Sequence, residues 1–231
     1  MRRILQLITA EKERLPQNIL FRWLADESIE GYERLSFTPA MLSYLMGFKD
    51  VLASLSRPAA STELDDMINA YCMEDAEHWR WYLADLQRLG FKLDSWGTSI
   101  PTFCNEVWGE QTKANRDTIF ALLYYSRLSS DPLLALTLVQ IFEATGVVFI
   151  GHTRRGAAAL GMDDELLYFG RLHFEEEFSH SVQSHDLAKY HMSDETSELA
   201  CQATKELFEH FHRMFNCWYQ HRGRFEAFRR A

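Results

Sequence analysis

The sequence predicts an all-α protein, a single bundle of seven or eight helices that occupies residues 1–231 as one domain. Helical periodicity recurs along most of the 231 residues, whereas the alternation typical of strands is almost absent. The hydrophobic content of 47% is enough to bury one sizeable core. No repeat, low-complexity tract or Gly/Ser linker divides the chain.

The first two helical segments are delimited by prolines. Residues 2–28 form an amphipathic segment that is interrupted at Pro16. Residues 38–56 form the next, with Pro39 in the first turn, where its missing N–H costs nothing.

The third segment is expected to be one continuous helix. Ser61 or Thr62 can cap its first turn, and Gly90 is suited to end it. Residues 91–110 then look like the only long irregular connection.

Four helical segments are expected in the second half of the chain. They cover residues 112–128, residues 131–161, residues 163–191 and residues 193–231. The segment at 131–161 is apolar on nearly every side, which is typical of a helix buried all round.

Composition narrows the class of partner and the compartment. The net charge is −9, and the only basic group is a short arginine-rich C-terminal tail, so nucleic acid is not an expected partner. The four cysteines are far apart and lack a CxxC, as in reduced cytosolic proteins. Without a signal sequence or a membrane-spanning apolar run, we expect a cytoplasmic protein that does not bind membranes.

The stretch LHFEEEFSH places three glutamates between two histidines. On a helix, Glu176 and Glu177 lie within about 60° of His173 and flank the line from His173 to His180. Glu175 lies on the opposite face and is expected to face solvent. Geometry alone leaves both Glu176 and Glu177 as candidates.

Two other segments carry residues of the same chemical kind. Asp75 and Glu74 precede His78 by three and four residues and share a helical face with it, whereas Glu77 does not. Glu143 lies in the most apolar helix, where an ionised carboxylate is costly unless it is paired or bound to a metal.

Each group also has a purely structural interpretation. Glu143 could pair with a buried arginine, His78 could be a core histidine beside two tryptophans, and residues 175–177 could be a charged outer face. Carboxylates and histidines on three helices nevertheless favour a metal site. This donor set suits iron or manganese, because zinc would more often recruit thiolates.

The set Asp75-x-x-His78, Glu143 and His173-x-x-x-Glu177-x-x-His180 resembles the haem-oxygenase-like di-iron oxidases and oxygenases. The run EDAEHWRWYLADLQRLG is also similar to that family. The resemblance covers most of the chain in helix order and implies a haem-oxygenase-like bundle. It selects Glu177 over Glu176 and implies six metal ligands, namely Asp75, His78, Glu143, His173, Glu177 and His180.

The resemblance also implies cofactors and a reaction. It implies two Fe2+ ions, with Mn2+ as a substitute, and dioxygen (O2) as co-substrate through a peroxo di-iron intermediate. The small-molecule substrate would carry an amine or a carboxylate, and some sequence features look similar to a nitrile-forming member that acts on a halogenated tryptophan. N-oxygenation, C–C cleavage and desaturation are the other outcomes. Arg154 and Arg155 are the candidates for binding a substrate carboxylate.

Two features leave alternatives open. Many family members carry a further acid before the acid-x-x-His pair, but Ile68 and Tyr71 occupy those positions here, so the second iron could bind weakly. A metal-free enzyme of the same fold, such as a thiaminase-like hydrolase using Cys72 or Cys201 or a cofactorless oxidase, is one alternative. A non-catalytic helical interaction protein is the other, and a homodimer is left open.

Overall fold

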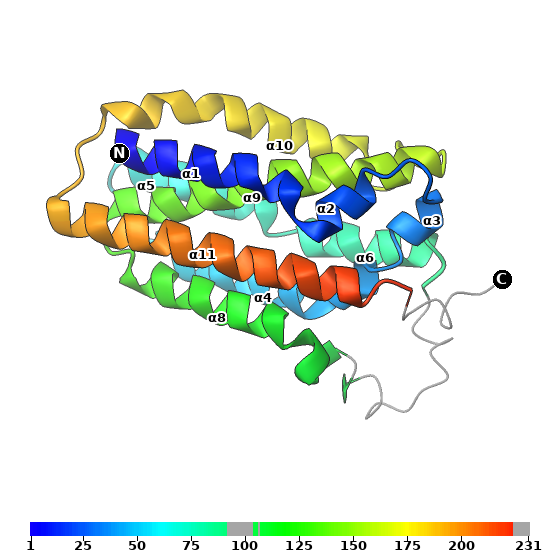
Figure 1. Ribbon diagram of the computed structural model, residues 1–231. Coiled ribbons are helices and arrows are strands. Elements are labelled where there is room, and N and C mark those ends of the chain that lie inside the picture. The colour runs from blue at the N-terminus through cyan, green and yellow to red at the C-terminus, as the bar shows by residue number, and fades with distance from the viewer. Residues whose placement is uncertain (92–103, 106, 224–231) are drawn as a thin grey trace.

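In the computed structural model the described residues are 1–91, 104–105 and 107–223, and for 178–186 the backbone alone is described. These residues form an all-α bundle without strands, as the sequence predicts (Figure 1). The α-helices are α1 (Arg2–Arg14), α2 (Ile19–Leu24), α3 (Gly31–Arg34), α4 (Leu42–Leu55), α5 (Glu63–Asp75), α6 (His78–Arg88), α8 (Lys113–Leu128), α9 (Pro132–Ala159), α10 (Arg171–Gln183) and α11 (Asp194–Gln220).

Helix α9 is the central helix of the bundle. It packs against α1, α5, α10 and α11, and Figure 1 shows it running with α1 between α10 and α11. It begins where the Asp131 side chain accepts a hydrogen bond from the N–H of Leu133, and Gly161 follows its end with a φ of +70°. Both ends agree with the predicted segment.

The expectation that no run could span a membrane needs correction. Among the described residues, Pro132–Ala159 is long and apolar enough to do so. However, 78% of its most apolar stretch is buried inside the protein, as in the core helix of a helical bundle.

The third predicted segment is two helices instead of one. Thr62 caps α5 in a reciprocal capping box with Asp65, but α5 ends at Asp75 and α6 begins at His78. The sequence has no glycine or proline at the break, so no local signal marks it. After the break, the ring of His78 contacts that of His173 on α10. Gly90 has a φ of +85°, as expected of a helix-ending glycine.

The segment predicted as a helix from residue 163 begins with turns, and α10 starts only at Arg171. The N–H groups of Leu167, Tyr168 and Phe169 donate to the carboxylate of Asp85. Because they are committed to a side chain of α6, they do not enter a helical hydrogen-bond ladder.

The N-terminal segments keep their predicted positions with short irregularities. Pro16 lies in a 3-10 turn, Leu15–Gln17, and Asn18 then caps α2. The segment that contains Pro39 likewise starts as a 3-10 turn, Thr38–Met41, before α4 begins.

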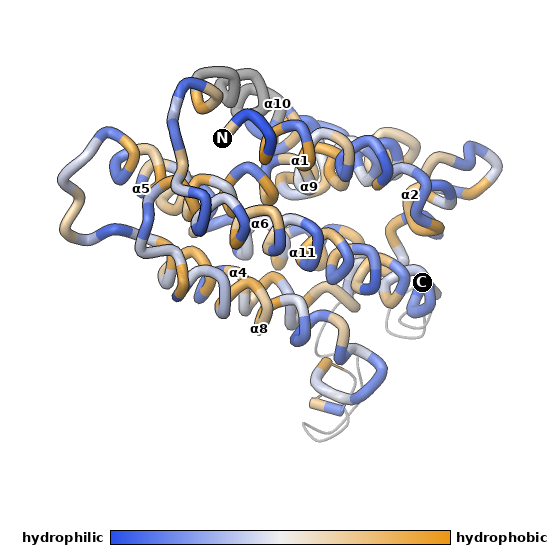
Figure 2. The backbone as a smooth tube through the Cα atoms, turned by 60° about the vertical axis from the view of Figure 1, so that its left-hand side comes forward, coloured by the Kyte–Doolittle hydropathy of each residue, from blue (hydrophilic) through white to orange (hydrophobic). Residues whose placement is uncertain are grey.

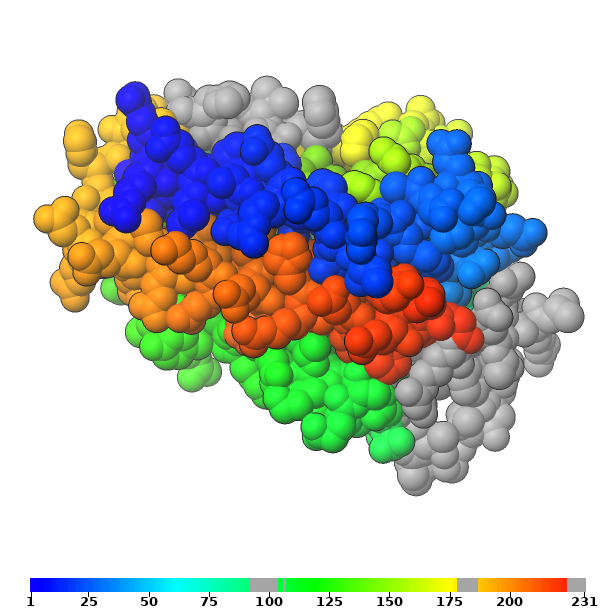
Figure 3. All heavy atoms as spheres, in the orientation of Figure 1, coloured from blue at the N-terminus to red at the C-terminus, as the bar shows by residue number. Residues whose placement is uncertain are grey.

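Helix α11 covers one side of the core. Ser193 caps it, and Leu207, Phe211, Met214 and Trp218 are buried along one face. Figure 2 shows hydrophobic and hydrophilic positions alternating along this helix. Figure 3 shows the N-terminal helices and α11 side by side across one face of the molecule, so the interior is shielded there.

Candidate metal centre

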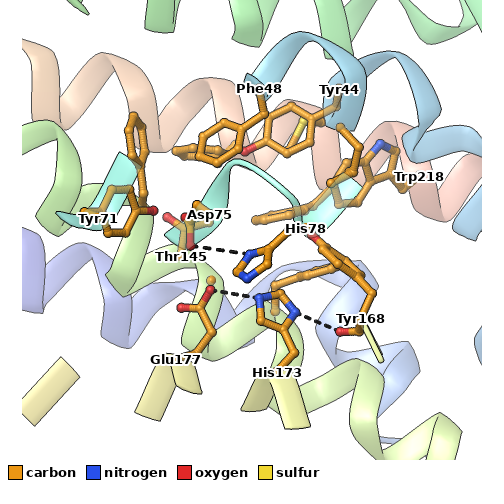
Figure 4. Close-up of a pocket in the computed structure, with 17 residues that line it drawn as sticks. Tyr44, Phe48, Tyr71, Asp75, His78, Thr145, Tyr168, His173, Glu177 and Trp218 are labelled. Carbon is orange, nitrogen blue, oxygen red and sulfur yellow. Dashed lines mark hydrogen bonds and ion pairs between the residues drawn. The ribbon is translucent and has the colours of Figure 1, made fainter. Parts of the chain in front are cut away.

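A cavity of about 60 Å³ lies between α4, α5, α6, α9, α10 and α11. Four predicted metal ligands line it together with aromatic side chains (Figure 4). The ligand-type residues are Asp75, His78, His173 and Glu177. The aromatic residues are Tyr44, Phe48, Tyr71, Phe142, Phe149, Tyr168, Phe211, Phe215 and Trp218.

His173 is held at both ring nitrogens. Its Nδ1 is 2.9 Å from the carbonyl oxygen of Tyr168, and its Nε2 is 3.2 Å from Oε1 of Glu177 (Figure 4). A carbonyl only accepts, so Nδ1 carries a hydrogen in the neutral ring, and Nε2 donates to the carboxylate of Glu177 when the ring is protonated. Burial opposes the charged form, but the hydrogen bond and charge of Glu177 outweigh it and raise the pKa of His173.

His78 lies opposite His173, with the two ring centroids 4.4 Å apart. Its Nδ1 is 3.4 Å from Oδ1 of Asp75, and its ring also packs on Trp81 at 4.7 Å. The Nε2 atom is 3.8 Å from Oε2 of Glu176. The structure thus places an acid from α5 and one from α10 on either side of this imidazole.

The three consecutive glutamates of α10 have different environments. Glu175 is exposed, as predicted, whereas Glu177 is buried beside His173. Glu176 is half-buried and approaches His78, so both candidates left by the helical geometry face the histidine pair. The side chain of His180 lies outside the described residues.

Glu143 is buried in α9, two and three residues before cavity-lining Thr145 and Gly146, but it is not itself part of the cavity wall. Burial, followed by the charges of Glu177, Asp75 and Glu74, raises its pKa to about 9.

Lys12 is a cation whose charge lowers the pKa of Glu143. Lys12 lies one helical turn after buried Ile8 of α1 and three residues before buried Leu15 of the following 3-10 turn. Burial lowers the pKa of Lys12, and the charges of Glu143 and Glu177 oppose this change.

Negative charge also accumulates around Asp75, as it does around Glu143. Burial and the charge of Glu177 raise its pKa to about 8, although a hydrogen bond from Tyr71 and the charge of His173 act in the opposite direction. Several carboxyls therefore share a buried volume in which they cannot all be ionised without a compensating cation.

The donor chemistry fits a divalent cation such as iron or manganese, because imidazole nitrogens and carboxylate oxygens meet in a buried site. The distances between these side chains are not those of a complete metal coordination sphere. Among the described side chains, no group of three or more His, Cys, Asp or Glu is placed to hold a metal ion. The rings of His78 and His173 contact each other directly, so ion binding requires these two side chains to separate.

Neither candidate for binding a substrate carboxylate lines the cavity. Arg154 makes a two-point contact with Asp163, at 2.8 and 2.9 Å, and its guanidinium lies 5.0 Å from the ring centroid of Phe174. Arg155 is exposed. The geometry therefore lends no support to this part of the hypothesis.

Neither cysteine of the thiaminase-like alternative, Cys72 or Cys201, lines the cavity. Cys72 is buried and is not part of the cavity wall, and burial raises its pKa to about 12. A nucleophilic cysteine needs a lowered pKa, so the environment of Cys72 is the opposite of what that reaction requires.

Three residues of the site were not found from the sequence. Tyr71 precedes Asp75 by one helical turn, and its position was noted only as the lack of an acid. Lys12 interrupts the apolar side of α1, which is a detectable signal. Asp85 acts on a segment more than 80 residues away, for which the sequence offers no local signal.

Comparison with family models and with curated proteins finds no match for this chain. The resemblance to the haem-oxygenase-like di-iron enzymes therefore stays a hypothesis based on the ligand motif.

Proposed function

We propose that this protein is a non-haem di-iron oxidase or oxygenase that uses O2, on a haem-oxygenase-like bundle. One observation carries the proposal. Four of the six motif residues, from three helices, line one aromatic cavity that accumulates buried carboxyl groups. A cation would relieve the repulsion among these carboxylates, which otherwise has to be relieved by protons.

The proposed ligands are Asp75, His78, Glu143, His173 and Glu177, with His180 as the sixth. Bound ferrous ions would supply the electrons for the reduction of O2. The protein's own residues hold and orient these groups.

Two neighbouring groups act on the proposed ligands. The carbonyl of Tyr168 accepts the Nδ1 hydrogen of His173, which leaves Nε2 directed at the site. The side chain of Tyr71, one helical turn before Asp75, favours the ionised form of that carboxyl by lowering its pKa. The aromatic wall excludes water from the reacting groups.

The proposed substrate is a small molecule with an amine or a carboxylate group, and an aromatic amino acid suits the aromatic lining best. Nitrile formation, N-oxygenation and C–C cleavage are the proposed outcomes. A volume of about 60 Å³ accommodates O2 or a few waters, so a substrate of amino-acid size requires aromatic side chains to move aside.

A metal-free enzyme is the second candidate, and one observation favours it. Asp75 with His78 at 3.4 Å and Glu177 with His173 at 3.2 Å form two carboxylate–imidazole pairs. Such pairs can transfer protons to and from a substrate without a metal.

Anaerobic titration of metal-free protein with Fe(II), followed by metal analysis and addition of O2, separates the two candidates. The proposal expects up to two irons per chain, oxygen consumption, and faster oxygen consumption with the correct amino acid. A protein that binds no iron under these conditions would refute the di-iron assignment and leave the metal-free one. Full iron binding without oxygen consumption would refute the oxidase mechanism.

A further inference from the structure

Asp85 is fully buried near the end of α6, and it does not line the cavity. Its carboxylate accepts three backbone hydrogen bonds from the segment before α10. The donors are Leu167 at 2.8 Å, Tyr168 at 2.7 Å and Phe169 at 3.0 Å. Burial raises the pKa of Asp85, and the three backbone donors and Arg88 oppose this rise by favouring the ionised carboxylate.

The third of these bonds, from the N–H of Phe169, connects Asp85 with the candidate metal centre through a single peptide group. The peptide group between Tyr168 and Phe169 has its N–H on Asp85 and its carbonyl oxygen on Nδ1 of His173, at 2.9 Å. One rigid peptide plane thus connects the two side chains. A negative charge on the N–H side polarises the peptide and strengthens its carbonyl as an acceptor.

The same segment also forms part of the cavity wall. The Tyr168 ring lines the cavity, with its centroid 4.7 Å from that of His173. Gly170 follows where the chain folds so tightly that a Cβ would collide with the carbonyl oxygens of Leu166 and Asp163. The segment is therefore closely packed, and its position depends on the acceptor of its N–H groups, which is Asp85.

We propose that Asp85 is a positioning residue for His173, acting through the Tyr168–Phe169 peptide. It holds the carbonyl that selects the Nδ1–H form of the imidazole, so that Nε2 is the nitrogen offered to a cation. The metal-binding part of this inference rests on the proposed function, whereas the choice of tautomer does not.

The experiment combines one variant with a matched control on the same network. Asp85→Asn replaces one acceptor oxygen by an NH2 group, which cannot accept from the backbone N–H groups. Arg88→Gln removes the other partner of Asp85, at 3.1 Å, and leaves the backbone contacts in place. Thermal melting establishes that each variant is folded. Nitrogen-15 NMR of the metal-free protein, at a pH above the His173 pKa, reports the tautomer, and a titration with Mn(II) reports affinity.

We expect Nδ1–H at His173 in the wild type and a mixture of tautomers in Asp85→Asn. Affinity for Mn(II) should fall about 10- to 100-fold in Asp85→Asn, the usual effect of removing an outer-shell partner, and should change little in Arg88→Gln. A folded Asp85→Asn protein with unchanged tautomer and affinity overturns the proposal.

Two outcomes separate this inference from the proposed function. If the wild type binds neither Mn(II) nor Fe(II), the proposed di-iron function is refuted. The role of Asp85 can then still be tested by comparing the His173 tautomer in the wild type and in Asp85→Asn. If Asp85→Asn does not fold, the tautomer of His173 in the wild type tests the proposal by itself. Nε2–H at His173 would contradict the proposal, and Nδ1–H would support it.

Discussion

Replacing Glu143 by glutamine should stabilise the metal-free protein. Burial and neighbouring carboxylates raise the pKa of Glu143 from 4.5 to about 9. At pH 7 the side chain therefore keeps its proton in the folded state and loses it in the unfolded state. Glutamine has nearly the same shape as the protonated acid and does not have to retain a proton.

The size of the effect follows from proton linkage. Holding the carboxyl protonated at pH 7, about 2.5 pH units above its ordinary pKa, costs folding about 3 kcal/mol. Because the pKa of Glu143 is raised on folding, the cost in folding free energy begins near the pKa of the unfolded state. It grows as the pH rises towards 9. Glu143→Gln should remove up to this amount, which for a chain of this size raises Tm by about 6–12 °C.

The variant should have the opposite effect on metal binding. It loses one proposed carboxylate ligand, and each tenfold loss of affinity lowers the stabilisation by saturating metal by about 1.4 kcal/mol. Melting curves with and without Mn(II) at pH 7 measure both effects, and exposed Glu175→Gln is the control, with an expected change within about 0.5 kcal/mol. A metal-free Glu143→Gln protein less stable than wild type would refute the reasoning, since it would mean that Glu143 is ionised in the folded protein.

Three further outcomes are expected. Glu177→Gln should weaken Fe(II) binding at least tenfold while Glu175→Gln leaves it intact, as measured by anaerobic titration, and equal effects would contradict the face assignment. Gly146→Ala should cost about 1–3 kcal/mol in thermal melts and reduce metal affinity, because its Cβ would lie 2.7 Å from Oε2 of Glu177. The metal-free protein should melt at lower temperature as pH rises from 5 to 9, since the pKa values of Asp75 and Glu143 are raised to about 8 and 9 and the folded state binds more protons. A calorimetric Tm that rises over this range would show that these carboxyls are not destabilising.

The sequence by itself determined the helical class and several helix ends. Asp131 and Ser193 begin α9 and α11, and Gly90 and Gly161 follow helix ends, because capping and left-handed glycines act within a few residues along the chain. The exposure of Glu175 also followed from the 100° helical step alone.

Only the tertiary structure decided how the site is assembled. No glycine or proline marks the break between Asp75 and His78 in the sequence. The non-helical turns before α10 depend on Asp85, which lies 82 to 84 residues earlier in the chain. Whether Glu176 faces solvent or His78, and which charged groups act on the buried Glu143, depends on which helices pack together. Such choices arise from contacts between distant segments, whereas helical periodicity records only the direction of each side chain from its own axis.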